Sequence, residues 1–128
     1  MITNADITLY NRHIENDMDV WYKTQIKNVH LYSDNKINLN TDGIKGASIF
    51  KIRVPISSFP KKYISKEEYQ EKQDVSDVFT VQNDDWIYLG LSNDDIKKPS
   101  DISTPKMMIY SYSINLVGGL PHIRISGG

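Results

Sequence analysis

The residues with the clearest chemical potential are two neighbouring acids, Asp84-Asp85, in the segment VFTVQNDDWIYLG. Two carboxylates beside the ring of Trp86 could form a catalytic pair, a metal site or the tip of a hairpin. Acid–base catalysis needs two carboxylates in different environments, one of them with a raised pKa. Neighbouring residues in a tight turn are both solvated, and Asn and Asp tolerate the positive φ of such a turn. We therefore predict a hairpin with Asn83-Asp84 at its tip and no catalytic role for the pair.

The spacing of the histidines and acidic residues along the sequence does not match a metal-binding motif. His13, His30 and His122 are widely separated and the chain has no cysteine, whereas a zinc site needs three or four converging ligands. The acidic segment SNDDIKKPSD, residues 92–101, lacks the regular ligand offsets, the glycine and the distal Glu of a calcium loop. We expect this segment to be a solvated loop with one helical turn starting at Ser92, and we predict no metal and no cofactor.

Nucleophiles and phosphate loops have no better support. No serine stands in a G-x-S-x-G motif, and His122 is expected at the start of a strand. The segment VGGLPH, residues 117–122, lacks the G-x-x-x-x-G-K-[ST] pattern and a following helix, so its glycines predict a turn. Lys61-Lys62 forms the basic–aromatic cluster of the chain, and a solvated surface is favoured over a binding contact. The sequence therefore favours a structural or interaction protein over an enzyme.

Composition limits the class of protein. A chain of 128 residues fits one β-rich domain over residues 1–128. Fifteen basic and 16 acidic residues give a formal charge of −1, which argues against phosphate-backbone binding as the main activity. The absence of cysteine excludes a disulfide framework and suits an intracellular protein. No signal peptide is visible, and the apolar stretches are too short for a membrane helix.

Alternation of apolar and polar residues predicts mainly strands. The segment 20–34 carries a bulge near Lys27-Asn28 because its apolar positions change parity there. Ser65 and Glu68 form an S-x-x-E capping box, which predicts one short helix within residues 64–72. The expected fold is mainly β, a small antiparallel barrel or sandwich of about six or seven strands with one short helix. Half-buried strands are expected at 6–13, 47–56, 106–117 and 120–127. In 47–56, Phe50, Ile52, Val54 and Ile56 fall on one face, and Pro55 marks an edge or the end of the strand. In 106–117, Met108, Tyr110, Tyr112 and Ile114 fall on one side, and in 120–127 Ile123 and Ile125 are paired.

The chain contains in order the segments MITNADITLYN, VWYKTQIKNV, ASIFKIRVPI, KKYISKEEY, VFTVQNDDWIYLG and LPHIRISGG. In this order they resemble a family of small proteins encoded in the structural gene cluster of tailed phages and prophages of low-GC Gram-positive bacteria. A recurrent D-[IV]-T-[IL]-Y opening of that family is matched by residues 6–10, and its Y-[IV]-x-x-x-E-[YW] motif by residues 63–69. The tip after VQN is commonly Gly-Asp in that family and is Asp84-Asp85 here.

By size, β content and gene setting, this family is similar to head-completion proteins, also called head-closure or stopper proteins. The resemblance implies a homo-oligomeric ring in the virion neck that assembles in the host cytoplasm, contacts the portal, its adaptor and tail-terminator proteins, and has no membrane contact. DNA would pass through its channel without sequence-specific binding. Strands 6–13 and 120–127 and the loop 35–46 could supply edges for strand addition between neighbours. Asp34, Asp42 or the acidic loop 92–95 could face such a channel.

Interface candidates follow from exposure and residue type. Trp21 and Trp86 are expected at the edge of the core, with an interface role as the alternative. The alternatives to head completion are a tail-terminator or tail-completion ring, a capsid-decoration protein and, with less support, a small hydrolase. The interface candidates are Asp42, Lys61, Lys62, Asp84, Asp85 and Trp86.

Overall fold

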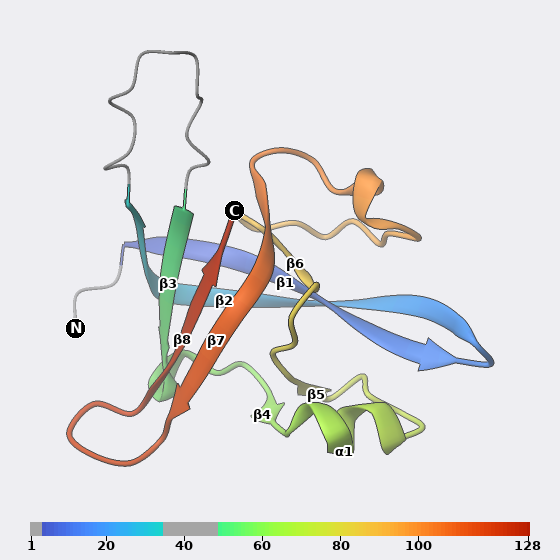
Figure 1. Ribbon diagram of the computed structural model, residues 1–128, viewed down its shortest axis with the longest axis horizontal. Coiled ribbons are helices and arrows are strands. Elements are labelled where there is room, and N and C mark those ends of the chain that lie inside the picture. The colour runs from blue at the N-terminus through green and yellow to red at the C-terminus, as the bar shows by residue number, and fades with distance from the viewer. Residues whose placement is uncertain (1–3, 35–48) are drawn as a thin grey trace.

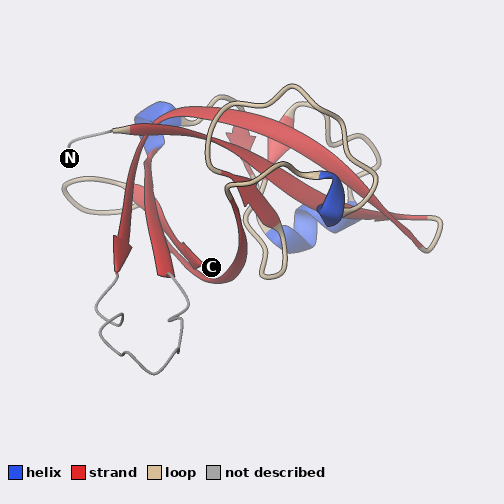
Figure 2. Cartoon of the chain, turned by 90° about the horizontal axis from the view of Figure 1, so that it is seen from above, coloured by secondary structure: helices blue, strands red, loops and turns tan. Residues whose placement is uncertain are grey.

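A closed antiparallel barrel forms the body of the protein. The computed structural model describes residues 4–34 and 49–128, and six of its strands close in the order β1-β2-β3-β8-β7-β6. Figures 1 and 2 show these strands wrapping around one interior. The prediction of a mainly β, small antiparallel barrel is confirmed. The barrel strands are β1 (Ala5–Glu15), β2 (Met18–Asp34), β3 (Ile49–Pro55), β6 (Trp86–Tyr88), β7 (Lys106–Asn115) and β8 (His122–Gly127).

Short elements lie between β3 and β7. β4 (Lys62–Tyr63) and β5 (Val78–Phe79) pair in parallel outside the barrel, and α1 (Lys66–Glu71) connects them. Ser65 is the N-cap of α1, and its Oγ accepts a hydrogen bond from the Glu68 backbone N–H at 3.2 Å. This bond satisfies one of the free amides at the helix start, as the S-x-x-E motif predicts. Two 3-10 helices, η1 (Ile56–Ser58) and η2 (Pro99–Asp101), complete the described elements. In the described ranges, no helix is long and apolar enough to span a membrane.

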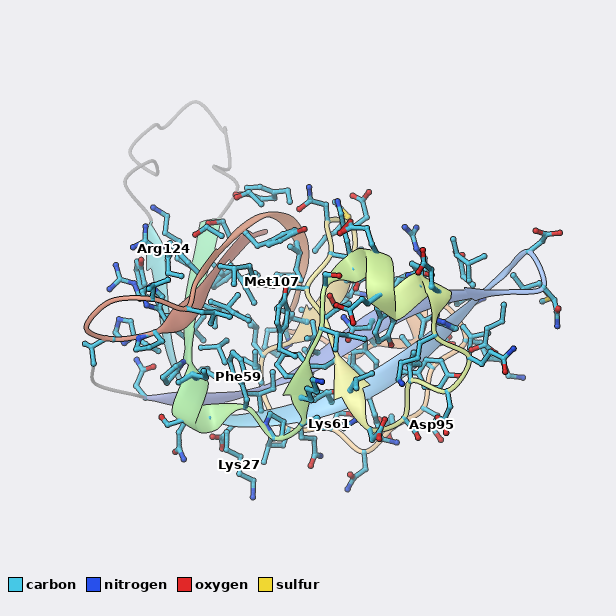
Figure 3. The ribbon with its side chains drawn as sticks, turned by 90° about the horizontal axis from the view of Figure 1, so that it is seen from below. Lys27, Phe59, Lys61, Asp95, Met107 and Arg124 are labelled. Carbon is cyan, nitrogen blue, oxygen red and sulfur yellow. The ribbon has the colours of Figure 1, made fainter. Side chains whose placement is uncertain are left out.

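Apolar side chains from all six barrel strands fill the interior. Ile52, Val54, Ile123 and Ile125 lie buried on the adjacent strands β3 and β8, as their alternation predicts. Burial of such side chains is the main stabilising contribution to the fold, roughly 1.5–3 kcal/mol each. Figure 3 places Met107 within this body. Ile56, expected on the same face, lies instead in η1 and is exposed, because the strand ends at Pro55.

The hairpin of β1 and β2 extends far beyond the barrel. β1 pairs with β6 only through Thr8, Leu9 and Tyr10, and beyond Tyr10 its strand partner is β2 alone. We call residues 11–22 the arm; Figure 1 shows it at the right. Asn16 and Asp17 form its turn with φ of 52° and 64°, the conformation that Asn and Asp tolerate in two-residue hairpins.

The predicted bulge in the second strand is confirmed. The β1–β2 register shifts between Ala5 and Ile7, where three residues of β2 face two of β1. Asn28 in this stretch has a φ of 62°, so the bulge changes which β2 side chains point inward.

Two predictions about strand faces are wrong. β1 is buried on both faces between Ile7 and Asn11, because the segment after β6 covers the face that was expected to be exposed. In β7, a bulge at Tyr110 changes which alternate residues point inward, so the residues expected on one side do not share a face. Before the bulge, Met107 and Ile109 are buried, and after it Tyr112 packs against the core. Tyr110 itself is exposed.

The strand edges expected for subunit contacts are not available. Thr8, Leu9 and Tyr10 of β1 lie between β2 and β6, and β8 lies between β3 and β7, because the barrel closes on itself. Barrel closure removes free strand edges. The loop 35–46 lies outside the described residues. The helical turn expected at Ser92 is also wrong, since the turn in this segment is η2, at residues 99–101.

Candidate functional site

The predicted hairpin around Asn83-Asp84 does not form. β5 pairs with β4, and β6 pairs with β1 and β7, so the two runs that flank the acids belong to different sheets. A turn is still present: the Asp85 backbone N–H donates to the Gln82 carbonyl at 3.3 Å, and Asp84 has a φ of 73°. Asp84 is exposed, but Asp85 has an exposed fraction of 0%. The expectation that both acids are solvated is therefore wrong for Asp85.

Three donors surround the buried carboxylate of Asp85. Its Oδ2 accepts hydrogen bonds from Nδ2 of Asn11 at 2.9 Å and from Nε2 of Gln82 at 2.8 Å. Its Oδ1 accepts from the backbone N–H of Arg12 at 3.2 Å. Burial raises the pKa of Asp85 to about 6, while these three hydrogen bonds and the positive charge of Arg12 oppose the rise. The carboxylate is thus an acceptor enclosed by the protein's own donors.

Asn11 takes the place of a missing strand partner. Its Oδ1 accepts from the Thr80 backbone N–H at 3.2 Å, and its Nδ2 donates to the Thr80 carbonyl at 2.8 Å. The amide therefore forms the two bonds that a neighbouring strand would form with residue 80. Both residues are buried, so each of these backbone groups needs such a partner.

Glutamine side chains cover the next part of the β1 edge. Gln70 on α1 donates to the Arg12 carbonyl at 2.7 Å and accepts from the Ile14 backbone N–H at 3.0 Å. Gln82 also donates to the Arg12 carbonyl, at 3.0 Å, and accepts from Gln70 at 2.8 Å. An uncovered strand edge invites pairing with other chains. Together with Asp85, these side chains satisfy the edge of β1 where β6 has ended.

His13 connects the arm to the end of α1. Its Nδ1 lies 2.8 Å from Oε2 of Glu15, and its Nε2 lies 2.8 Å from the carbonyl oxygen of Lys72. Both partners are acceptors, so both hydrogen bonds form together only when the imidazole carries two protons. The Tyr22 hydroxyl donates to the same Glu15 oxygen at 2.6 Å. The bonds from Tyr22 and His13 lower the pKa of Glu15, and the bond to Glu15 raises the pKa of Tyr22.

We call Asn11, His13, Gln70, Gln82 and Asp85 the arm-base network. Its members form hydrogen bonds with one another, with backbone groups and, in the case of His13, with the side chain of Glu15. This arrangement fits a structural clamp that fixes the arm to the barrel. An open depression of about 400 Å³ beside α1 is lined by Lys66, Glu67, Gln70, Glu71 and Gln82. Within residues 4–34 and 49–128, no three His, Asp or Glu side chains are placed to hold a metal ion.

The proposed interface residues lie in different surroundings. Asp42 falls outside the described residues. Lys61 is half-buried and its Nζ donates to Oγ1 of Thr24 at 3.2 Å; burial lowers its pKa. Lys62 and Asp84 are exposed. Trp86 is half-buried at the edge of a small apolar cluster, and the Lys106 ammonium lies 5.3 Å from the centre of its ring.

Exposed apolar side chains gather in the loop between β7 and β8 and also occur on both faces of the arm, two places that the sequence did not single out. We call Leu116, Val117 and Leu120, in the loop between β7 and β8, the β7–β8 tip; Val117 is 88% exposed and Leu120 63%. At the arm, Ile14 and Met18 are 51% and 68% exposed. Isolated exposed apolar residues are common, but gathered ones mark interaction surfaces. Figures 1 and 2 place the tip and the arm at opposite ends of the protein.

One sequence signal pointed to the arm-base network. Asn11 and His13 have the same parity in the strand as the apolar residues Ile7 and Leu9, so two polar side chains fall on the inward face. A buried polar side chain needs a buried partner. The identity of that partner, Asp85, depends on the path of the chain between β5 and β6, and no local pattern encodes that path.

Comparisons with known proteins give a family without an assigned activity. No curated protein and no solved structure matches the chain. The match to a family model covers residues 2–128, nearly the whole sequence. The chain therefore belongs to DUF6751, a family of unknown function.

Proposed function

We propose that this chain is a structural subunit of a tailed-phage virion, one copy in a head-completion ring that closes the DNA exit channel and docks the tail. The motif resemblance supplies the virion setting. The observation that carries the proposal is the position of the exposed apolar side chains, at the β7–β8 tip and at the arm, on opposite ends of one barrel. A subunit with contact surfaces at two ends can bind a neighbour on each side, which is the requirement for a ring.

The arm-base network supports an assembly role over catalysis. A general acid or base has to reach a substrate, whereas Asp85 is enclosed and its oxygens accept bonds from protein donors. The same bonds hold the arm in a fixed direction, which favours a preorganised contact with a neighbour. Because the barrel is closed, we propose contacts through side chains of the arm and loops and not through strand addition at residues 6–13 or 120–127.

The test is imaging of the purified protein mixed with portal and adaptor proteins. Negative-stain class averages should contain a ring of density beneath the adaptor that is absent without this chain. Expanded capsids that lack portals form the second arm of the experiment. Binding to those capsids, with no ring on the portal complex, would contradict head completion and favour capsid decoration. A ring that binds tail tubes but no portal complex would favour a tail-terminator.

A further inference from the structure

A pocket at the arm has the chemistry to receive the β7–β8 tip of another copy. It has a volume of about 260 Å³ and lies between β2 and the segment that follows β6. Its apolar lining comes from Met18, Val20, Trp21 and Ile96, with Asp19 and Lys97 as the polar members. We call it the arm pocket. Ile96 is buried against Tyr10, and Trp21 packs on the same cluster, so its walls are part of the packed structure.

Polar contacts fix the outer wall of the arm pocket. Nζ of Lys23 lies 2.6 Å from Oδ1 of Asp95, and Gln25 donates to the Ser92 carbonyl at 2.9 Å and to Oδ1 of Asn93 at 3.1 Å. These bonds tie the segment 92–97 to β2. A preformed pocket loses little conformational entropy on binding, which favours affinity.

The β7–β8 tip is a protruding apolar loop, the shape that is complementary to the concave arm pocket. Leu116, Val117 and Leu120 project from a loop that contains two glycines, and exposed Ile56 lies beside them, because its backbone N–H donates to the Pro121 carbonyl at 3.1 Å. A protruding apolar loop suits a concave apolar pocket, since a buried aliphatic anchor contributes much of the energy of an interface.

The charges beside the β7–β8 tip are positive, whereas those beside the arm pocket are mainly negative, with Lys97 as a cation in the pocket wall. Arg53 and Arg124 are directly paired across β3 and β8, near the base of the β7–β8 tip. Like charges in directly opposed positions destabilise a sheet, and among the described residues neither arginine has an ion pair with a carboxylate. The Arg53 guanidinium lies 5.9 Å from the centre of the Tyr32 ring, and Arg124 is exposed. Neither positive charge is neutralised by a carboxylate of the described residues.

Exposed carboxylates lie near the arm pocket. Asp17 and Asp19 are exposed in the arm, and Asp94 is exposed in the segment opposite. Asp95 is already paired with Lys23, so these three are the carboxylates available to a partner. Figure 3 shows Arg124 and Asp95 on opposite sides of the protein.

We propose that the β7–β8 tip of one copy inserts into the arm pocket of a second copy, with Arg53 and Arg124 facing Asp17 and Asp19 of that copy. The contact is heterologous, because it joins two different surfaces of identical chains. Repetition gives a closed ring if the rotation between copies closes, and a filament if it does not. This inference rests on the proposed function, which requires a ring, and it names the two surfaces that build it.

The size of the protein allows both contacts at once. A stable interface takes about 800 Å² from each partner, and the chain exposes 7496 Å². Two such interfaces occupy about a fifth of that surface, and they lie at opposite ends. Each copy can therefore bind one neighbour through its tip and another through its arm pocket.

The test uses the purified full chain and two surface variants, Val117→Asp at the tip and Met18→Asp at the arm pocket. Tyr110→Asp is the matched control, since Tyr110 is also a large exposed side chain, at 45%, and lies on neither surface. Thermal melting first establishes that all three variants fold. Sedimentation velocity over a concentration series then gives the association of each protein.

We expect the wild type to form species larger than the 14.7 kDa chain. Each surface variant should associate at least about 10-fold more weakly, a loss of about 1.4 kcal/mol, and the control should behave as the wild type. A wild type that stays monomeric up to about 1 mM, where only contacts weaker than about −4 kcal/mol remain undetected, would overturn the proposal. So would surface variants that associate normally.

Mixing the two variants distinguishes a heterologous contact from a symmetric one. Val117→Asp keeps its arm pocket and Met18→Asp keeps its tip, so an equimolar mixture should form one-to-one dimers and nothing larger. A mixture that stays monomeric would contradict the proposed pairing of surfaces.

The charged part of the contact has its own test. Arg124→Glu and Asp19→Lys should each weaken association by about 3-fold, and the double variant should recover most of the loss. Failure of the double variant to recover would show that the two side chains do not meet.

A lipid surface is the other occupant that an apolar tip beside arginines could take. Flotation with phosphatidylglycerol vesicles tests it with the same variants. Vesicle binding that is lost in Val117→Asp, with self-association unchanged, would overturn the proposal. Because these measurements use the chain alone, their failure leaves the portal experiment unaffected, and a missing ring on the portal complex leaves the tip-and-pocket contact standing.

Discussion

Replacement of the buried carboxylate by an amide, Asp85→Asn, tests the arm-base network directly. The substitution keeps the shape of the side chain but replaces one acceptor oxygen by an NH₂ group. The neighbours of the carboxylate, Nδ2 of Asn11, Nε2 of Gln82 and the Arg12 amide, are all donors. Asn11 cannot turn over without losing both bonds to Thr80. One donor therefore faces another in either orientation, and we expect a loss of about 3 kcal/mol in the free energy of unfolding near neutral pH.

The stability lost in Asp85→Asn should also depend on pH, because Asp85 titrates and asparagine does not. Burial raises the pKa of Asp85 from 3.8 to about 6. The folded protein then holds the proton more tightly than the unfolded chain, so the stabilising contribution of this group is fully present below pH 3.8 and is lost as the pH rises through 6. At about 1.4 kcal/mol per unit of pKa shift, the contribution of Asp85 to the free energy of unfolding differs by about 3 kcal/mol between low and high pH.

Other carboxylates act in the opposite direction. Hydrogen bonds lower the pKa values of Glu15, Asp74 and Asp101, so their contributions are lost as the pH falls. They are common to the wild type and Asp85→Asn, and they cancel in the difference between the two proteins.

Urea unfolding of both proteins between about pH 4.5 and 7.5 measures that difference. The advantage of the wild type over the variant should grow by about 2 kcal/mol as the pH is lowered across this range. Asp84→Asn, at the exposed neighbouring position, is the matched control and should change the free energy of unfolding little, because its side chain is solvated. A difference that stays constant, or that grows as the pH rises, would refute the assignment of Asp85 as a desolvated carboxylate.

Further substitutions test neighbouring parts of the structure by the same unfolding assay. Ser65→Ala removes the N-cap of α1 and should cost about 1 kcal/mol; Ser57→Ala, at an exposed serine, is its control, and equal losses would contradict the capping role. Asn11→Leu leaves the Thr80 backbone groups and Asp85 without their partner and should cost about 3 kcal/mol; a loss below about 1 kcal/mol would mean that water replaces the amide. Tyr69→Phe removes a buried hydroxyl that has no hydrogen-bond partner within residues 4–34 and 49–128 and should leave the free energy of unfolding unchanged or raised, so a clear loss would reveal a partner for that hydroxyl.

Strand content and one face of most strands could be predicted because they depend on local alternation. Ile52, Val54, Ile123 and Ile125 lie inward as their spacing predicts. The parity change in the second strand located the bulge at Lys27-Asn28 for the same reason. In the last long strand, residues 107–110 are consecutive apolar residues, so alternation does not determine which of them point inward and does not locate the bulge at Tyr110.

The candidate site was harder to predict because its parts come from distant segments. Asn-Asp is good turn chemistry at residues 83–84, and a turn does form there, but the runs on either side join different sheets. The pair for which this chemistry closes a hairpin is Asn16-Asp17, in the arm. Solvation of Asp85 was inferred from its position beside a turn. Its burial follows from the position of Asn11, 74 residues away in the sequence.

The most direct test of a virion role is deletion of the gene in an infectious phage that encodes this chain, followed by electron microscopy of the lysate and measurement of packaged DNA. We predict heads that lose their genome, with unattached tails, and rescue by the wild-type chain supplied in trans. Particles that keep their DNA, join tails and infect normally without the protein would contradict the account.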